Sequence, residues 1–394
     1  MTAAGVREYI EAIRGRYVGS RKSEKGRLLD EAVKVTGYHR KAIVRLLGRS
    51  GTGNVPYRRG RPRRYGSEVA EALKVLWEAS DRVCSRRLHP FLPELMGVLR
   101  RHGEQQLSPE VEAQLMEMSP STIDRLLGPV RSRDGRLRFS ITKPGSLLRD
   151  SIPLRTFADW NDEGPGFLEV DLVAHCGEST EGFYLHTLST VDIATGWVEC
   201  QGVWGKNQDR VGSAIHHIAQ RLPFRLLGLD SDNGSEFINH HMVAYCERKG
   251  ITFTRARPYK KNDSAHVEQK NWTAVRRLVG YDRYSSRAAL DTLNRLYDLM
   301  RWYSNFFQPV MKLQHKSRHG AKVHKIYDRA KTPYRRLLDS GALSEGQRRH
   351  LAATYARLNP IKLRSQIDDT LSRLWALSDA FNNSSRSQRR SVTA

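Results

Sequence analysis

The order of strand-like and helix-like segments between Phe167 and Val279 is the sequence feature that most constrains the fold. Three short segments rich in β-branched and aromatic residues follow one another with tight connections, at 167–175, 183–196 and 197–204. Helices and strands then alternate, with helices at 208–221 and 236–249, strands at 224–232 and 251–256, and a last helix at about 263–279. Three meandering strands followed by two crossover strands predict a mixed five-stranded sheet with helices on its faces.

This layout is that of an α/β RNase H-like fold, and it places three acidic residues where burial is costly. Asp171 interrupts an apolar run that is typical of a central strand buried on both faces. Asp232 ends the fourth strand, and Glu268 stands in line with apolar residues 4, 7 and 11 positions later on the last helix. An ionised carboxylate buried without a partner costs several kcal/mol. Three such carboxylates in one fold therefore indicate a bound cation.

The predicted topology brings these three carboxylates together. A crossover strand beside the first strand places Asp232 next to Asp171, and the following helix brings Glu268 to the same edge, with 35 residues between Asp232 and Glu268 (268 − 232 − 1). Hard divalent ions, Mg²⁺ or Mn²⁺, fit such an all-oxygen site. Asp230 shares a strand face with Asp232, but Asp232 lies at the strand end, where a metal and a substrate can approach. We therefore assign the metal to Asp232 and a supporting role to Asp230.

Three blocks of the sequence carry a family resemblance. FLEVDLVA, LDSDNGSEFIN and RPYKKNDSAHVEQKNW occur in this order within roughly residues 160 to 285. They resemble the catalytic blocks of the retroviral-integrase superfamily, specifically those of bacterial insertion-sequence transposases with an integrase-type DDE core. The resemblance implies that Asp171, Asp232 and Glu268 are the catalytic, metal-binding triad and that two Mg²⁺ ions are used, with Mn²⁺ as a substitute. The chain differs from retroviral integrases because it lacks an N-terminal His-His-Cys-Cys zinc module and because its C-terminal region is predicted to be helical.

The resemblance implies a polynucleotidyl transferase, a DDE transposase that cleaves DNA at the ends of a mobile element and joins those ends to target DNA. Two metal ions can activate a water or a 3′-hydroxyl on one side of a phosphodiester and stabilise the leaving oxygen on the other. The chain has no G-x-x-x-x-G-K-[ST] loop, so we expect no nucleotide energy source. Two alternatives remain: an RNase H-like nuclease without strand transfer, and a catalytically inactive DNA-binding regulator.

Two segments N-terminal to the core are predicted to be helix-turn-helix units. Residues 28–48 break between two helical segments, and the second segment presents Arg40 and Lys41 near its start, where a recognition helix meets base edges. Its motif AIVRLLG returns about eighty residues later as TIDRLLG, where we expect Ser121 and Thr122 to contact DNA. The alternative is that both units are ordinary amphipathic helices of a bundle.

Two further basic segments are expected to contact DNA. Gly and Pro exclude a helix at 55–66, which resembles an AT-hook whose arginines lie in a minor groove; a solvated basic linker is the alternative. Basic residues also flank Glu268, where either phosphate contacts or a solvated helix face would explain them. The predicted contact residues are Arg58, Arg59, Arg61, Arg63 and Arg64 in the linker and Lys260, Lys261, His266 and Lys270 beside Glu268.

The charge balance favours a polyanionic partner, because 66 Lys and Arg against 42 Asp and Glu give a net charge of +24. We expect double-stranded DNA, both element ends and target, and not a membrane, since no basic amphipathic helix and no apolar run of 18 residues stand out. Joining two ends to one target implies a homo-oligomer on DNA. Four scattered cysteines and a charged N-terminal segment predict a cytoplasmic protein. The resemblance to insertion-sequence transposases implies a bacterial, nucleoid-associated one.

The predicted organisation comprises six segments. They are an N-terminal helix-turn-helix (1–54), a basic AT-hook-like linker (55–66), a second helical helix-turn-helix domain (67–145), the RNase H-like integrase catalytic core (155–285), a helical C-terminal region (286–380) and a disordered tail (381–394). The tail is assigned on its Ser- and Arg-rich composition.

Overall fold

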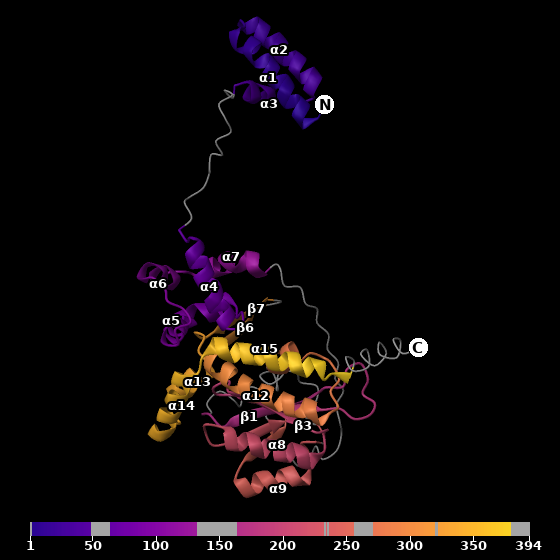
Figure 1. Ribbon diagram of the computed structural model, residues 1–394, viewed down its shortest axis with the longest axis vertical. Helices are drawn as coiled ribbons and strands as arrows, with labels where there is room; N and C mark the ends of the chain where they lie inside the picture. The colour runs from indigo at the N-terminus through magenta and orange to yellow at the C-terminus, as the bar shows by residue number, and fades with distance from the viewer. Residues whose placement is uncertain are drawn as a thin grey trace, which may run out of the picture. The chain divides into compact units, whose positions relative to one another are not determined.

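Two units make up the chain, Met1–Arg64 (unit 1) and Tyr65–Ala394 (unit 2) (Figure 1). The computed structural model describes residues 2–48, 64–131, 164–231, 234, 236–255, 271–319 and 322–379. The domain boundaries drawn from the sequence remain predictions.

Unit 1 is a cluster of three helices with its own small core. The helices are α1 (Ala3–Gly19), α2 (Lys22–Thr36) and α3 (Arg40–Leu47). Gly37 ends α2 in the left-handed conformation, with φ 73°, which glycine adopts without the strain that a side chain brings. Apolar residues of the three helices, among them Ile10, Ala32 and Ile43, are buried against one another. The break between α2 and α3 lies where the sequence predicts it, whereas DNA binding by this unit stays a prediction.

The five-stranded sheet predicted from the sequence is confirmed in unit 2. Its strands are β1 (Phe167–Ala174), β2 (His186–Asp192), β3 (Val198–Val203), β4 (Gly228–Ser231) and β5 (Thr252–Arg255). Their order is β3-β2-β1-β4-β5. The pairs β1–β2 and β2–β3 are antiparallel, and the pairs β1–β4 and β4–β5 are parallel. The first strand of the sequence therefore lies at the centre of a mixed sheet, which is the arrangement of an RNase H-like core.

Helices flank this sheet on the connections that the sequence indicates. α8 (Gln208–Arg221) packs on β3, and α9 (His240–Lys249) packs against α8 and β5. α12 (Arg287–Phe307) runs along β3 and packs on its other side against α15 (Pro360–Ala376) (Figure 1). The described chain before α12 contains a π-helical turn, η2 (Asn271–Arg276), followed by α11 (Arg277–Val279). π-helical turns are rare in proteins, and those that occur are often found at functional sites.

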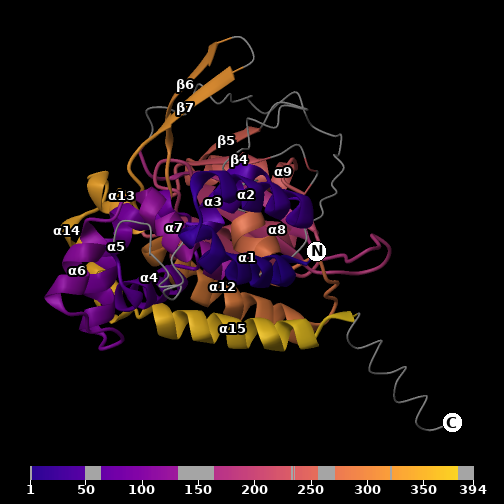
Figure 2. The same ribbon diagram turned by 90° about the horizontal axis from the view of Figure 1, so that it is seen from above.

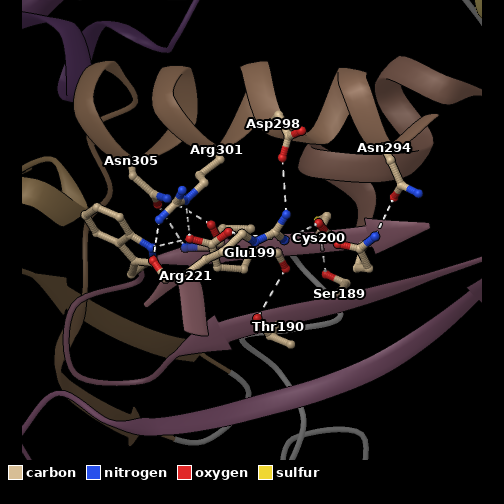
Figure 3. Close-up of polar contacts among 12 residues, drawn as sticks. Ser189, Thr190, Glu199, Cys200, Arg221, Asn294, Asp298, Arg301 and Asn305 are labelled. Carbon is tan, nitrogen blue, oxygen red and sulfur yellow. Dashed lines mark hydrogen bonds and ion pairs between the residues drawn. The ribbon is translucent and has the colours of Figure 1, made fainter. Parts of the chain in front are cut away.

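Side chains of α8 and α12 bind the outer edge of β3 (Figure 3). Every second residue of this edge strand turns its backbone polar groups away from β2. The bonds are Val198 N to Asn305 Oδ1 at 2.8 Å, Asn305 Nδ2 to Val198 O at 2.8 Å, Arg221 Nη2 to Cys200 O at 3.0 Å, and Gly202 N to Asn294 Oδ1 at 2.7 Å. These contacts make the edge unavailable to a strand of another molecule.

One buried carboxylate links β3 to both helices (Figure 3). Glu199 accepts hydrogen bonds from Trp197 Nε1 at 2.9 Å and Arg301 Nε at 2.7 Å. Arg221 Nη2 lies 3.5 Å from its other oxygen, and Arg221 Nη1 also pairs with Asp298 at 3.2 Å. Burial raises the pKa of Glu199, and the charges of the two arginines oppose that shift. The sheet and the two helices thus share a charge network whose partners depend on one another.

The helices at 67–131 share their hydrophobic core with the sheet and the C-terminal helices. The additional helices are α4 (Ser67–Ala79), α5 (Ser85–Arg101), α6 (Pro109–Met116), α7 (Pro120–Arg131), α13 (Pro333–Asp339) and α14 (Glu345–Arg357). Hydrogen bonds cross between these two parts of the chain: Tyr303 Oη to Ala79 O at 2.8 Å, Arg335 Nε to Glu94 Oε1 at 3.0 Å, and Asn359 Nδ2 to Glu104 Oε1 at 2.6 Å. The second helical segment is therefore built into unit 2.

The region after α12 is not wholly helical, contrary to our expectation for 286–380. β6 (Leu313–His319) and β7 (Lys322–Tyr327) form an antiparallel two-stranded sheet between α12 and α13. The prediction is wrong here because the stretch contains few apolar residues, so it shows neither the helical nor the strand period.

Candidate active site

Asp171, the first predicted metal ligand, lies within the central strand. It is opposite Ser189 of β2 in the register. On the other side of β1, the described pairing with β4 ends at Val170, which is opposite Ser231. Asp171 therefore lies one residue past the last of these pairs, at the C-terminal end of β4. Open α/β sheets form their sites at the C-terminal ends of strands where the strand order switches.

Both oxygens of the Asp171 carboxylate accept hydrogen bonds. Leu172 N donates to Oδ1 at 2.8 Å, and Asn271 Nδ2 donates to Oδ2. Arg276, at the other end of η2, adds positive charge: burial lowers its pKa, and Asp171 is one of the groups whose charge opposes this shift. The π-helical turn thus supplies a hydrogen-bond donor to the carboxylate, which is bonded at both oxygens.

The side-chain oxygen of Asn271, Oδ1, is relevant to whether a metal ion could bind at Asp171. Asn271 Oδ1 is buried and has no hydrogen-bond partner among the described residues. Carboxylate and amide oxygens are the donors that hard divalent cations prefer, directly or through a bound water. Within the described ranges, no group of three or more His, Cys, Asp or Glu could hold a metal ion. The residues at Asp171 fit a hard cation in chemical type, and further ligands would have to come from elsewhere in the chain.

Asp230, the acid assigned a supporting role, is buried in the sheet. Its side chain is 2% exposed and accepts a hydrogen bond from Thr254 Oγ1 of β5 at 2.6 Å. In the register it lies between Glu169 and Thr254. The hydrogen bond from Thr254 thus links the Asp230 carboxylate of β4 to β5.

Most of the other predicted site residues fall outside the described ranges. These are the catalytic residues Asp232 and Glu268 and the DNA-contact residues Arg58, Arg59, Arg61, Arg63, Lys260, Lys261, His266 and Lys270. Asp171 is thus the one member of the predicted triad whose surroundings the structure describes.

Of the predicted DNA-contact residues within the described ranges, all but Arg64 lie at helix starts. Arg40 is the first residue of α3, is exposed and forms an ion pair with Asp30, and Lys41 follows it. In α7, the Thr122 hydroxyl lies 3.1 Å from Ser119 Oγ and accepts a hydrogen bond from Arg125 Nη2 at 3.1 Å. Ser121 is exposed, and Arg64 ends unit 1. None of these contacts tests DNA binding.

Sequence reasoning missed Asn271 and Arg276. Asn271 follows Glu268 by three residues, a spacing that shares one face of a helix. That spacing was the available signal, but an asparagine next to basic residues has no distinctive pattern. The contact to Asp171 depends on residues a hundred positions apart.

A chain of buried polar side chains runs from His175, the residue after β1, through Thr187 of β2 to Tyr297 of α12. His175 Nε2 lies 2.7 Å from Thr187 Oγ1, which lies 2.5 Å from Tyr297 Oη. Burial, helped by the charge of Arg276, lowers the pKa of His175 to about 3. Burial, followed by the charge of Lys206, lowers the pKa of His186 to about 4. Both imidazoles are therefore neutral near pH 7 and belong to the support of the sheet.

Sequence comparison places the chain among known proteins. No protein-family model matches the sequence. An uncharacterized protein named y4rM, from Sinorhizobium fredii (strain NBRC 101917 / NGR234), is 48% identical over 322 residues, which are 81% of this chain and 91% of that protein. The chain belongs to the y4rM family. The alignment with y4rM covers most of the chain, including a large part of unit 2.

A comparison with solved structures finds a distant structural similarity for this member of the y4rM family. The catalytic core domain of BIV integrase aligns with 45% of the chain and 96% of that domain, at 20% identity and a TM-score of 0.29. The fold assignment rests on the strand order and directions of the sheet. Among the described helices, none is both long and apolar enough to cross a membrane.

Proposed function

We propose that this chain is a metal-dependent polynucleotidyl transferase that cleaves DNA at the ends of a mobile element and joins them to target DNA. The observation that carries the proposal is the position of Asp171 on the central strand, beside the C-terminal end of β4 and bound by the first residue of η2. The sheet order supports it, because this order brings the β1 and β4 strand ends together.

The proposed ligand set is Asp171, Asp232 and Glu268. Asp232 is the next residue in sequence after Ser231, whose partner Val170 directly precedes Asp171. Neighbouring strands lie about 4.8 Å apart, so a register continued by one residue would set two carboxylates side by side. Glu268 precedes Asn271 by three residues, close to one helical turn. Asn271 is already at Asp171, and this short spacing supports Glu268 as the third carboxylate.

The chemistry follows from this ligand set. Two Mg²⁺ ions, when bound, would activate the attacking water or 3′-hydroxyl and stabilise the leaving oxygen of the phosphodiester. Asn271 holds the Asp171 carboxylate in place through Oδ2, and Leu172 N holds Oδ1. Because the side chain is half-buried and fixed at both oxygens, little reorganisation is needed before a cation binds.

Duplex DNA is the proposed partner, as element end and as target. The net charge of +24 supports it, because cationic side chains that neutralise phosphates release counterions and dominate affinity. Arg40, Lys41, Ser121 and Thr122 stand at the starts of α3 and α7, positions from which helix-turn-helix proteins contact bases. Two ends joined at one target would require at least two copies of the chain on DNA.

The experiment that tests this function separates strand transfer from hydrolysis. A labelled duplex that carries the DNA flanking the gene, with a recessed 3′-hydroxyl, is incubated with the full chain, supercoiled plasmid and Mg²⁺. We expect covalent joining of the label to the plasmid. Hydrolysis products alone would identify a nuclease without strand transfer, and DNA binding without either product would identify an inactive regulator.

A further inference from the structure

The β6–β7 hairpin is a surface that the proposed active site does not use. Figure 2 shows the two strands extending away from the sheet and the helices of unit 2. The strands pair with each other from Leu313 opposite Tyr327 to His319 opposite Lys322, with an irregularity between Leu313 and His315. A two-stranded hairpin without a third strand or a packed helix is marginally stable in water. A binding partner would therefore contribute to its order.

The charge of this hairpin has one sign. Between residues 313 and 327 the sequence contains four Lys or Arg and three His, and no Asp or Glu. The register places Lys316 opposite Lys325. Opposed residues of like charge destabilise a sheet when they have no counterion. This arrangement is unfavourable for the free hairpin and becomes favourable beside a polyanion.

Polar contacts fix the base of the hairpin to the rest of unit 2. Lys312 Nζ donates to the carbonyls of Ile193 and Ala194, in the turn between β2 and β3. Asp328 Oδ1 accepts from Lys312 N at 2.7 Å, and Asp328 Oδ2 pairs with Arg336 Nη1 at 2.6 Å. A further backbone bridge between Val310 and Lys331 closes the base. The hairpin therefore projects from a fixed base on the catalytic sheet.

Described side chains of the hairpin are open to solvent. His315, His324, Lys325, Ile326 and Tyr327 are exposed, Ile326 and Tyr327 at 44% and 43%. An exposed isoleucine and tyrosine within a cationic strand are typical of a contact surface, because they add apolar area to charge. The hairpin thus offers both kinds of contact on one projecting element.

From these observations we propose that the β6–β7 hairpin is a DNA-binding β-ribbon that enters the major groove of B-form duplex DNA. The major groove is about 12 Å wide and admits a two-stranded ribbon. A strand of seven residues is about 23 Å long at ~3.3 Å per residue, enough to cross that groove. The major groove of duplex RNA is deep and narrow, which excludes a ribbon. The inference rests on the proposed action on DNA, since it names a second contact for that substrate.

The test measures binding without chemistry. The full chain is titrated against a labelled DNA duplex of about 30 base pairs, and against an RNA duplex of the same sequence, at several salt concentrations from about 50 to 200 mM. The hairpin variant carries Lys316→Ala, Arg318→Ala, Lys322→Ala and Lys325→Ala. The control variant removes the same charge from exposed positions of α14 and α15, with Arg349→Ala, Arg357→Ala, Lys362→Ala and Arg373→Ala. Far-UV circular dichroism and thermal melting check that both variants fold.

Each lost phosphate contact reduces the magnitude of the negative slope of log K against log salt by about 0.9. We therefore expect the hairpin variant to reduce this magnitude by roughly 2 to 3.6 on DNA and the control by less than about 1. Equal effects of the two variants would overturn the proposal, as would a loss of affinity for RNA alone. The result is separable from the proposed function. If no joining is seen with any DNA but the hairpin variant changes the salt slope, the proposed transferase function is wrong and the hairpin contact with DNA is supported. If joining depends on Asp171 while the slope is unchanged, the hairpin inference fails alone.

Discussion

Asn271 donates a hydrogen bond through Nδ2 to Oδ2 of Asp171, which joins the first residue of η2 to the central strand. The two residues are a hundred positions apart, and Leu172 N bonds the other carboxylate oxygen. The carboxylate is therefore oriented by the protein before any cation binds. This relationship makes Asn271 a positioning residue for the proposed metal site.

Replacement of Asn271 by Ala is expected to lower the rate of strand joining by about 10- to 100-fold, the usual cost of losing a residue that orients a ligand. DNA affinity should change little, because the contact that is lost is the one between Asn271 and the Asp171 carboxylate, and not one of the proposed contacts with DNA. The measurement is the joining rate as a function of Mg²⁺ concentration, and we expect the variant to need more Mg²⁺ for half-maximal rate.

The matched control is Gln366→Ala, a polar residue exposed on α15 far along the chain from the site. It should leave both the rate and the Mg²⁺ dependence unchanged. An Asn271→Ala variant with a lower rate but an unaltered Mg²⁺ dependence would show that Asn271 supports the fold and does not position the ligand.

Stability should decrease as pH falls below 6.5. Burial lowers the pKa of His175 from 6.5 to about 3 and that of His186 to about 4, so between these values the unfolded chain binds protons that the folded chain does not. The free energy of unfolding therefore falls with pH in this window, by up to ~1.4 kcal/mol per pH unit for each histidine. Urea unfolding at pH 5, 6 and 7 measures it.

The variant His175→Gln tests the assignment of this pH dependence. It should flatten the decrease between pH 6.5 and 5 by about half, because one of two buried imidazoles is gone. The substitution His216→Gln, at an exposed position of α8, is the control. A pH dependence that is the same in all three proteins would contradict a role for His175.

Glu199 should be essential to the stability of the sheet edge. Its side chain is fully buried and bonds Arg301 and Arg221. Glu199→Gln therefore removes the carboxylate from Arg301 and leaves Arg221 with its pair to Asp298. Because these arginines are partly exposed, we expect a loss of about 3 kcal/mol, near the low end for breaking a buried pair. Denaturant unfolding measures the loss.

The exposed Glu247→Gln of α9 is the control for that substitution and should change stability by less than about 0.5 kcal/mol. Combining Glu199→Gln with Arg301→Met should recover part of the loss, since the unpaired cation is removed as well. Additive losses in the double variant would argue that Glu199 and Arg301 do not depend on each other.

The sequence predicted the sheet because its strands carry strong local signals, and it predicted Asp171 because an acid within an apolar run is conspicuous. The partners of Asp171 could not be predicted, since Asn271 reaches it only through the folded arrangement of η2 on β1. The β6–β7 hairpin was missed for a different reason. Its strands pair with each other, the contacts of Lys312 fix their base, and their sequence contains few apolar residues, so hydrophobic periodicity does not reveal them.

The central claim is that Asp171, Asp232 and Glu268 act together on DNA. Its most direct test is Mg²⁺-dependent joining of the labelled element end to plasmid by the full chain and by Asp171→Asn, Asp232→Asn, Glu268→Gln and Asp230→Asn, with DNA binding measured in parallel. We predict that each of the first three variants loses joining by at least about 1000-fold while it still binds DNA, and that Asp230→Asn, if folded, retains joining. Joining that survives Asp171→Asn or Asp232→Asn would contradict the account.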